Sequence, residues 1–316
     1  MRHSIPSLTR LLVVATSAAL LAACGSSDGG GGPKDAPTGS LKLSVTDAPV
    51  DDAEAVWIQF RAVEFKPEGG SPVRHELLGA GSPPGPAPQS INLLPLQDGR
   101  SAVLVNDLEL PAGRYEWIRL IVDNVENERD SYIVIDGNEC ELRVPSGDES
   151  GLKLIRGFTL PADGSVALTV DFDLRKSIVE PPGQQGTGID CSQAYLLKPV
   201  LRLVQDSDVG AITGTVDPSL FLPDCSRLVY VFSDGTNPAG STLPDDQDLN
   251  EPNPVVMVEA DDVTGAYHAS FLPSGNYTVA FTCGLDDMAA DDALVFSATK
   301  AASVEPNLIE SGVNFP

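Results

Sequence analysis

Hydrophobic and polar residues alternate with a period of two along most of the chain. Leu41, Leu43 and Val45 are separated by single polar residues, and Val56, Ile58 and Phe60 alternate with a more polar set. Successive side chains of a β-strand point to opposite faces, so this period predicts strands buried on one side. Strands are expected at residues 41–45, 56–61, 117–122, 131–135, 166–173, 195–204, 211–216, 227–233, 255–259, 267–271, 277–283 and 294–298.

Turn residues separate these strands, and no amphipathic stretch of a dozen residues predicts a long helix. The chain has 29 Gly and 26 Pro, and such short strands with frequent turns are typical of β-sandwiches. A turn motif occurs twice, as LPAGRY at 110–115 and LPSGNY at 272–277. We predict an all-β protein with two β-sandwich domains, immunoglobulin-like or prealbumin-like, at residues 39–205 and 210–316. Residues 79–90 are expected to form an exposed loop.

The N-terminus has the organisation of a bacterial lipoprotein signal peptide. A basic start precedes an apolar run at 11–21, which is too short to span a bilayer, and Leu-Ala-Ala-Cys at 21–24 resembles the lipobox. Residues 1–23 are therefore expected to be cleaved and Cys24 to be lipidated. The alternative is an ordinary secretory signal with a chance cysteine. Residues 24–38 would form a Gly/Ser-rich tether with a reach of about 20 Å.

These features predict a protein attached by its lipid to the bacterial cell envelope. By resemblance to Gram-negative lipoproteins, Gly25 directly after the cysteine favours the outer membrane. Several acyl chains bind a membrane strongly, because each buried methylene contributes about 0.8 kcal/mol.

Four cysteines remain after Cys24, and an even number in an exported protein indicates disulfides. Two lie in each predicted domain, which favours Cys140–Cys191 and Cys225–Cys283 among three connectivities. Each bond would close a loop and, in the chain-entropy model, stabilise the folded state by about 4 kcal/mol. Four free buried thiols are the alternative.

Charge narrows the range of partners. The formal net charge is −25, and the second segment carries only Arg227 and Lys300 as basic residues. Proteins bind nucleic acid largely by neutralising phosphates with Lys and Arg, so nucleic acid is not expected as a partner.

Catalytic motifs are absent from the sequence, but one pair of carboxylates is a candidate. Asp171 and Asp173 flank Phe172 on a predicted strand, which would place them on one face, roughly 6–7 Å apart. Paired carboxylates at that range hydrolyse glycosides. A solvated strand face, with Arg175 or Lys176 nearby, is the more ordinary interpretation. His75 and His268 are expected at the surface.

Two acidic clusters are candidate Ca²⁺ sites, because hard oxygen ligands suit that ion. The first contains Asp245, Asp246, Asp248 and Asn250, followed by Glu251; the second contains Asp286, Asp287, Asp291 and Asp292. The first lacks the glycine and the bidentate Glu of an EF-hand loop. A hydrated acidic loop is the alternative, and no other cofactor is expected.

The two tryptophans are candidate ligand contacts. Trp57 shares a strand face with Gln59 and Arg61, and Trp117 shares one with Tyr115 and Arg119. If the two strands lie in one sheet, Trp57, Arg61, Trp117 and Arg119 would form a platform on which a sugar can stack. A covering sheet or loop over the rings is the alternative.

Six segments carry a resemblance to a bacterial family known as domain of unknown function 4382. They are GSLKLSVTDAP at 39–49, INLL at 91–94, LPAGRYEWIRL at 110–120, VPSG with GLKL at 144–154, DFDLRKSI at 171–178 and LKPV at 197–200. The resemblance implies a β-rich exported domain without a known activity. Residues 210–316 are similar to prealbumin-like, carboxypeptidase-regulatory or carbohydrate-binding-like sandwiches.

The expected function is a non-catalytic binding, adhesion or scaffolding role at the envelope. A glycan or an envelope protein is the expected partner, in addition to the membrane. A carbohydrate-binding lipoprotein is the first alternative, and a polysaccharide hydrolase that uses paired carboxylates is the second.

Overall fold

The computed structural model describes most of the chain after the predicted tether. The described residues are 36–47, 53–79, 85–123, 129–144, 151–181, 191–198, 200–223, 225–234, 236, 242–244, 254–284, 293–296 and 299–316. Residues 36–316 form one compact unit. No helix in this described part is long and apolar enough to cross a membrane.

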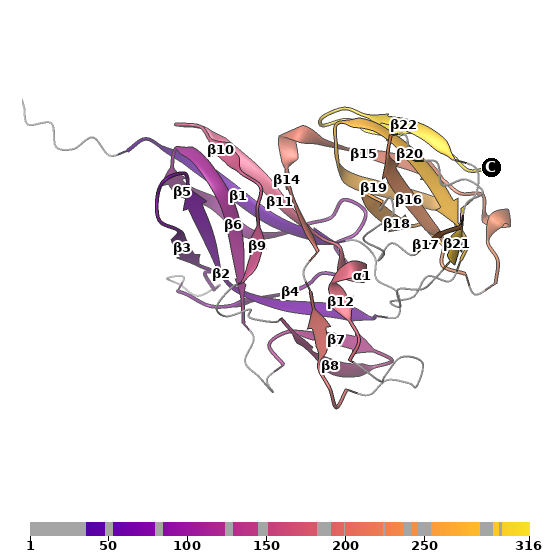
Figure 1. The fold of residues 1–316 in the computed structure, drawn as a ribbon, viewed down its shortest axis with the longest axis horizontal. Helices are drawn as coiled ribbons and strands as arrows, with labels where there is room; N and C mark the ends of the chain where they lie inside the picture. Colours follow the sequence, from indigo (N-terminus) through magenta and orange to yellow (C-terminus); the bar gives the residue numbers. More distant parts are fainter. Residues whose placement is uncertain are drawn as a thin grey trace, which may run out of the picture. The chain divides into compact units, whose positions relative to one another are not determined.

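We call residues 36–205 the first half of the described chain and residues 209–316 the second half. The first half contains a four-stranded sheet in the order β14-β11-β1-β5 (Figure 1). Its strands are β1 (Thr38–Asp47), β5 (Ala102–Pro111), β11 (Ser165–Phe172) and β14 (Leu201–Gln205). β1 pairs in parallel with β11 and antiparallel with β5.

A ten-stranded sheet forms the other layer of the first half. Its main path is β10 (Phe158–Leu160), β6 (Gly113–Val122), β2 (Ala55–Pro67), β7 (Tyr132–Ile135), β8 (Asn138–Arg143), β13 (Tyr195–Leu197) and β12 (Ile178–Val179). β3 (Val73–Glu76) and β4 (Gln89–Asn92) pair with β2, and β9 (Leu152–Leu154) pairs with β6.

The core of the first half lies between these two sheets, as the alternating pattern predicts. Leu41, Leu43 and Ile58 are fully buried in one apolar cluster. Phe60 of the larger sheet meets Phe172 of the smaller one edge to face, with ring centroids 6.1 Å apart. Two sheets with a shared apolar interior make this half a β-sandwich, which confirms the predicted fold class.

The second half has a smaller pair of sheets with its own apolar core. One sheet has the order β19 (Ala266–Pro273), β15 (Val209–Thr215), β23 (Ile309–Ser311). The other has the order β18 (Val256–Glu259), β16 (Leu228–Ser233), β20 (Gly275–Thr282), β22 (Lys300–Val304). β17 (Thr242–Pro244) and β21 (Ala293–Val295) form a separate pair. The helical elements among the described residues are the short α1 (Leu174–Ser177), η1 (Asp206–Asp208) and η2 (Pro218–Leu220).

Both halves repeat one strand arrangement. β1 pairs antiparallel with β5 and parallel with β11, and β15 pairs antiparallel with β19 and parallel with β23. The repeated turn motif joins β5 to β6 and β19 to β20, so in each half it carries the chain from one sheet to the other. Among the described strands, no pairing crosses residues 206–208. The division into two domains at this point stays a prediction.

One predicted strand is in fact two. Residues 195–204 contribute β13 to the ten-stranded sheet and β14 to the four-stranded sheet. Pro199 has no N–H group for a ladder, and the N–H of Val200 instead donates to Ser177 Oγ at 2.9 Å. The chain can therefore change sheets between Leu197 and Leu201.

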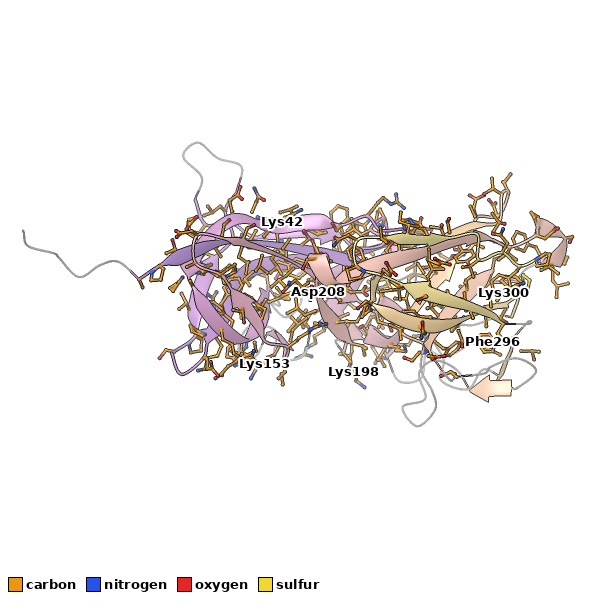
Figure 2. The ribbon with its side chains drawn as sticks, turned by 90° about the horizontal axis from the view of Figure 1, so that it is seen from above. Lys42, Lys153, Lys198, Asp208, Phe296 and Lys300 are labelled. Atoms are coloured by element: carbon orange, nitrogen blue, oxygen red, sulfur yellow. A yellow bond between two sulfur atoms is a disulfide. The ribbon has the colours of Figure 1, made fainter. Side chains whose placement is uncertain are left out.

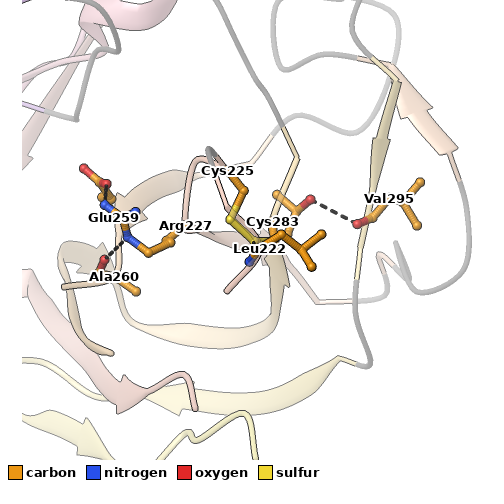
Figure 3. The surroundings of a disulfide bond; sticks show 8 residues. Leu222, Cys225, Arg227, Glu259, Ala260, Cys283 and Val295 are labelled. Atoms are coloured by element: carbon orange, nitrogen blue, oxygen red, sulfur yellow. Dashed lines mark hydrogen bonds and ion pairs between the residues drawn. A yellow bond between two sulfur atoms is a disulfide. The ribbon is translucent and has the colours of Figure 1, made fainter. Parts of the chain in front are cut away.

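Each half contains one disulfide, and the pairing is the one that the sequence favours. Cys140 bonds to Cys191, and Cys225 bonds to Cys283. Thr282 Oγ1, next to Cys283 in the sequence, donates a hydrogen bond to the Val295 carbonyl at 3.0 Å. Figure 3 shows Val295 near the Cys225–Cys283 bond. The disulfide and this hydrogen bond hold the end of β20 to two neighbouring segments.

Candidate functional site

A cleft of about 750 Å³ opens at the carboxyl ends of the parallel strands β1 and β11. The register places Thr46 opposite Asp171 and Asp47 opposite Phe172, so two distant segments bring polar residues to one sheet end. The lining residues are Thr46, Asp47, 97–99, 171–173, Lys176, Lys198, 200–202, 254–259, His268, Ser270 and Phe271.

Asp171 forms an ion pair within this cleft. It lies opposite Arg202 on β14, and Arg202 donates to Asp171 Oδ2 from Nε at 3.1 Å and from Nη2 at 2.5 Å. Burial raises the pKa of Asp171, and the charge of Arg202 opposes that rise. A raised pKa shows that burial outweighs the favourable guanidinium contact.

Asp173 also lines the cleft, but it has left the strand. It is the N-cap of α1, where its carboxylate accepts a hydrogen bond from the Lys176 N–H at 3.3 Å and pairs with Lys176 Nζ at 2.9 Å. The predicted common strand face of Asp171 and Asp173 is therefore wrong, because β11 ends at Phe172. The two carboxylates share the cleft, each with its own cation.

The opposite wall comes from β18 and β19 of the second half. Met257 of β18 accepts a hydrogen bond from Arg175 Nη1, with 3.6 Å between nitrogen and sulfur. Arg175 is fully buried, so this arginine of α1 ties the first half to the second. The sequence suggested Arg175 only as a neighbour of the carboxylates.

Two backbone features shape this second wall. Phe271 has a φ of +56°, a conformation that bulky residues rarely adopt. Gly99 has a φ of +80°, and a Cβ built on it would lie 2.7 Å from Ser270 Oγ. The turn at 97–99 therefore packs directly on β19, and only glycine fits there.

Four of the five acidic residues that line the cleft have a basic partner, including Asp98 with Arg100 at 3.6 Å, and the fifth is the buried Asp47. Asp171 pairs with Arg202, Asp173 with Lys176, and Glu259 with Arg227 at 2.6 Å. The exposed side chain of Lys198 adds a further cation (Figure 2). Although the chain has a net charge of −25, these acidic side chains of the cleft each form an ion pair with a basic side chain.

The predicted tryptophan platform is not formed. Both strands lie in the ten-stranded sheet, but Trp117 lies opposite Lys66, nine residues along β2 from Trp57. That spacing corresponds to about 30 Å. Trp57 instead stacks on Tyr132 with ring centroids 6.1 Å apart.

Trp117 is only 9% exposed. Arg119 and Lys153 lie 4.8 Å and 4.6 Å from the centre of its ring. Tyr115 points into the core and does not share the face of Trp117, because the register shifts between Lys66 and Pro67. The indole is therefore covered by two cations rather than by a second sheet.

Both platform arginines have acidic partners. Arg61 pairs with Asp123 at 2.9 Å, and Arg119 pairs with Glu64 at 3.2 Å. Their positions on the sheet give no reason to expect a common ligand contact with the two tryptophans.

Several predicted sites lie outside the described residues. These are the lipidation site Cys24, the first acidic cluster with Asp245, Asp246, Asp248, Asn250 and Glu251, and the second cluster with Asp286, Asp287, Asp291 and Asp292. Within the described ranges, no group of three or more His, Cys, Asp or Glu side chains could hold a metal ion.

His75 and His268 have different environments. His75 packs edge-on against Phe65, with centroids 5.9 Å apart, and burial lowers its pKa. His268 lines the cleft, although the sequence suggested only a surface position.

Three of the six segments that carry the family resemblance meet at the cleft. GSLKLSVTDAP supplies Thr46 and Asp47, DFDLRKSI supplies residues 171–173 and Lys176, and LKPV supplies Lys198 and Val200. The sequence identifies these segments separately, but not their convergence, which depends on the parallel pairing of β1 with β11.

Comparison with solved structures gives matches at low identity. The minor pilin GBS52 of Streptococcus agalactiae is 9% identical over 87% of this chain and 94% of its own, with a TM-score of 0.20. The major pilin subunit BcpA of Bacillus cereus is 11% identical over 88% of this chain and 99% of its own, with a TM-score of 0.18. The Bacillus anthracis TIE protein is 12% identical over 87% of this chain, with a TM-score of 0.19, and this chain spans 33% of that protein.

No curated protein matches the sequence. A family model does match, over residues 38–199, and it is described as a domain of unknown function, DUF4382. The matched range covers more than half of the chain and includes every strand of the first half except β14. The chain therefore belongs to the DUF4382 family.

Proposed function

We propose that this protein is a lipid-anchored, non-catalytic binding protein of the bacterial cell envelope, and that it binds its ligand in the cleft. The cleft itself carries this proposal. Its volume of about 750 Å³ lies within the range of roughly 300–1,000 Å³ that is typical of ligand sites. Apolar walls with a few convergent polar groups are also typical of such sites.

The ion pairs support a binding role over a catalytic one. A glycosidase needs one carboxylic acid to donate a proton and a second carboxylate to activate water or attack the sugar. Asp173 is engaged as a helix cap and by Lys176 Nζ, and Asp171 accepts two hydrogen bonds from Arg202. Both groups therefore have structural partners already.

One observation favours the hydrolase as a second candidate. Burial raises the pKa of Asp171, which is the direction that a general acid requires. Release of reducing ends from envelope polysaccharide separates the two functions. We expect no release above background, and a release that Asp171→Asn abolishes would establish the hydrolase.

The lipid anchor rests on the sequence alone. The leader, the cysteine at 24 and the Gly/Ser-rich stretch that follows have the order expected for a lipoprotein. Attachment at Cys24 would leave the cleft free to reach envelope components at the distance set by the tether. Mass spectrometry of the native protein should find an acylated N-terminal cysteine, and Cys24→Ser should release the protein from membranes.

Binding is tested by retention of labelled envelope material on the immobilised full chain. Lys198→Trp places a large side chain at the exposed rim of the cleft, whereas Lys300→Trp changes a lysine of β22 that does not line it (Figure 2). We expect Lys198→Trp to lose at least tenfold in retention and Lys300→Trp to retain as much as the wild type. Equal retention by both variants would exclude the cleft as the binding site.

A further inference from the structure

We infer that the cleft binds an uncharged, hydroxyl-rich ligand, namely a segment of neutral oligosaccharide. This inference rests on the proposed function, because it names the ligand class of the same cleft. Three independent observations support it: the compensated charges, two polar atoms without partners, and the strained aromatic residue of the apolar wall.

Charge compensation argues against an ionic ligand. Asp171 and Asp173 are each held by a basic side chain, so an incoming cation would compete with an existing ion pair at either carboxylate. An incoming anion could pair with Lys198, but this side chain is exposed, and pairs at exposed, solvated charges contribute little. A group that carries a formal charge needs an opposite charge when it leaves water. Hydroxyl groups need only hydrogen-bond partners, which charged pairs still provide through their remaining donors and acceptors.

Two polar atoms in the cleft have unused hydrogen-bonding capacity. Arg202 Nη1 and Ser270 Oγ are buried, and neither has a hydrogen-bond partner among the described residues. Both residues line the cleft, from β14 of the first half and β19 of the second. Buried polar groups normally have partners. Both atoms are buried in the cleft wall, so contact with a ligand requires a rotation of the Arg202 or Ser270 side chain; a sugar hydroxyl could then accept from the guanidinium and donate to or accept from the serine.

The apolar wall provides a surface for the carbon face of a sugar. Met257 and Phe271 both line the cleft, and Phe271 is held at a φ of +56°. Such strain persists only where the surrounding structure enforces it, and it is frequent at ligand sites. Glycine would adopt this conformation without strain, so local backbone preference does not account for an aromatic residue at position 271.

A fatty acid or another purely apolar ligand fits less well. It would fill the volume but leave Arg202 Nη1 and Ser270 Oγ unsatisfied, at a cost in affinity. An oligosaccharide satisfies the polar atoms and covers the apolar wall with a single ligand.

The test is ¹³C NMR of methionine methyl groups in the full-length protein, in zwitterionic detergent without sugar headgroups. The chain has three methionines, Met1, Met257 and Met288, and only Met257 belongs to the described cleft. The probes are neutral hexasaccharides (cello-, malto-, xylo- and chitohexaose), anionic hexagalacturonate, cationic hexaglucosamine and decanoate. We expect at least one neutral hexasaccharide to shift the Met257 signal, with smaller shifts from the charged probes and from decanoate.

Variants locate the contacts. Ser270→Ala and Arg202→Lys should each weaken binding of the neutral probe about tenfold, as loss of a buried polar contact does. Phe271→Gly should weaken it similarly while leaving the unfolding midpoint unchanged or higher, which a merely structural role would not produce. Arg119→Lys is the matched control, because it alters an Arg–Glu pair outside the cleft and should leave affinity unchanged.

Several results would overturn the inference. A Met257 shift with hexagalacturonate, hexaglucosamine or decanoate, and none with any neutral probe, would assign the cleft to another ligand class. Neutral sugars that bind without shifting Met257 would place the sugar site elsewhere. If no probe shifts Met257 but Lys198→Trp still abolishes envelope retention, the sugar inference fails and the proposed function stands. If Lys198→Trp also retains envelope material normally, the proposed function fails with it.

Discussion

Tyr115 and Tyr277 hold equivalent corners of the two halves. The Tyr115 hydroxyl donates to the Pro111 carbonyl at 2.8 Å, and the Tyr277 hydroxyl donates to the Pro273 carbonyl at 2.6 Å. Each bond spans the turn that carries the chain between sheets, as tyrosine corners do in other β-sandwiches. The repeated turn motif in the sequence therefore corresponds to a repeated hydrogen bond.

We expect Tyr115→Phe and Tyr277→Phe each to lower the free energy of unfolding by about 1 kcal/mol, because each removes one intramolecular hydrogen bond and keeps the ring. Urea unfolding measures the effect. Tyr132→Phe is the control, since the described residues give the Tyr132 hydroxyl no hydrogen bond while its ring stacks on Trp57. Loss of stability only in the control would refute the role of the corners.

Asp171 should give stability an unusual pH dependence. Burial raises its pKa above the ordinary value of 3.8, so the folded protein binds this proton more tightly than the unfolded chain. Its contribution to stability is then present below that value and declines as the pH rises through the folded pKa. Removing the group by Asp171→Asn should therefore make the variant progressively more stable, relative to the wild type, as the pH rises from about 3 to 7.

Asp217 provides a control of opposite sign. The hydrogen bond from the Ser219 N–H lowers the pKa of Asp217, so its contribution is present at neutral pH and is lost as the pH falls. Asp217→Asn should thus lose relative stability as the pH rises. Urea unfolding across this range measures both variants, and the same trend for both would contradict this account of Asp171.

At the scale of elements, the turn between β4 and β5 is fixed against β19. Gly99 combines a positive φ with a close approach to Ser270 Oγ, whereas Gly69, with a φ of +67°, has open space around its Cβ position. A substitution at Gly69 therefore measures the cost of the positive φ alone, whereas a substitution at Gly99 measures that cost together with the cost of a steric clash.

Gly69→Ala should cost about 1 kcal/mol from the left-handed backbone alone. Gly99→Ala should cost clearly more, since the added methyl also displaces Ser270, and it should alter the cleft wall. Thermal unfolding of the two variants gives the comparison. Equal costs would show that the turn moves away from β19 without difficulty.

Element prediction succeeded where alternation was regular. The first parts of β1 and of β2 bury every second residue, so their hydrophobic period is visible in the sequence. β5 was not predicted from the sequence, because exposed polar residues such as Asn106 and Asp107 interrupt its hydrophobic alternation. Its pairing with β1 is irregular as well. The bulge between Phe60 and Ala62 also changes which face later residues of β2 occupy.

At the scale of the whole molecule, each half has its own apolar core and its own disulfide. Replacing Cys225 and Cys283 together by alanine should remove about 4 kcal/mol from the stability of the second half, because the unfolded chain is no longer cross-linked. Differential scanning calorimetry should show one transition moving down and another unchanged. A single transition that moves as a whole would mean that the halves unfold together and that the predicted domain boundary is wrong.

The candidate site could be predicted only in fragments. Asp171, Asp173 and His268 attract attention in the sequence because of their chemistry, and the structure places all three at the cleft. Their partners Arg202 and Met257 were not predicted. Arg202 depends on the antiparallel pairing of β14 with β11, and Met257 depends on the contact with Arg175. Local sequence patterns carry no information about such long-range contacts.

Hydrogen exchange of the full chain, with and without polysaccharide extracted from the bacterial envelope, tests whether the ligand binds in the cleft. We expect slower exchange in both walls of the cleft, at residues 171–176 and 200–202 of the first half and 254–259 and 268–271 of the second. We expect no change in the strand segments around Trp57 and Trp117. Protection confined to those two segments, or binding without protection of either wall, would show that the ligand does not bind in the cleft.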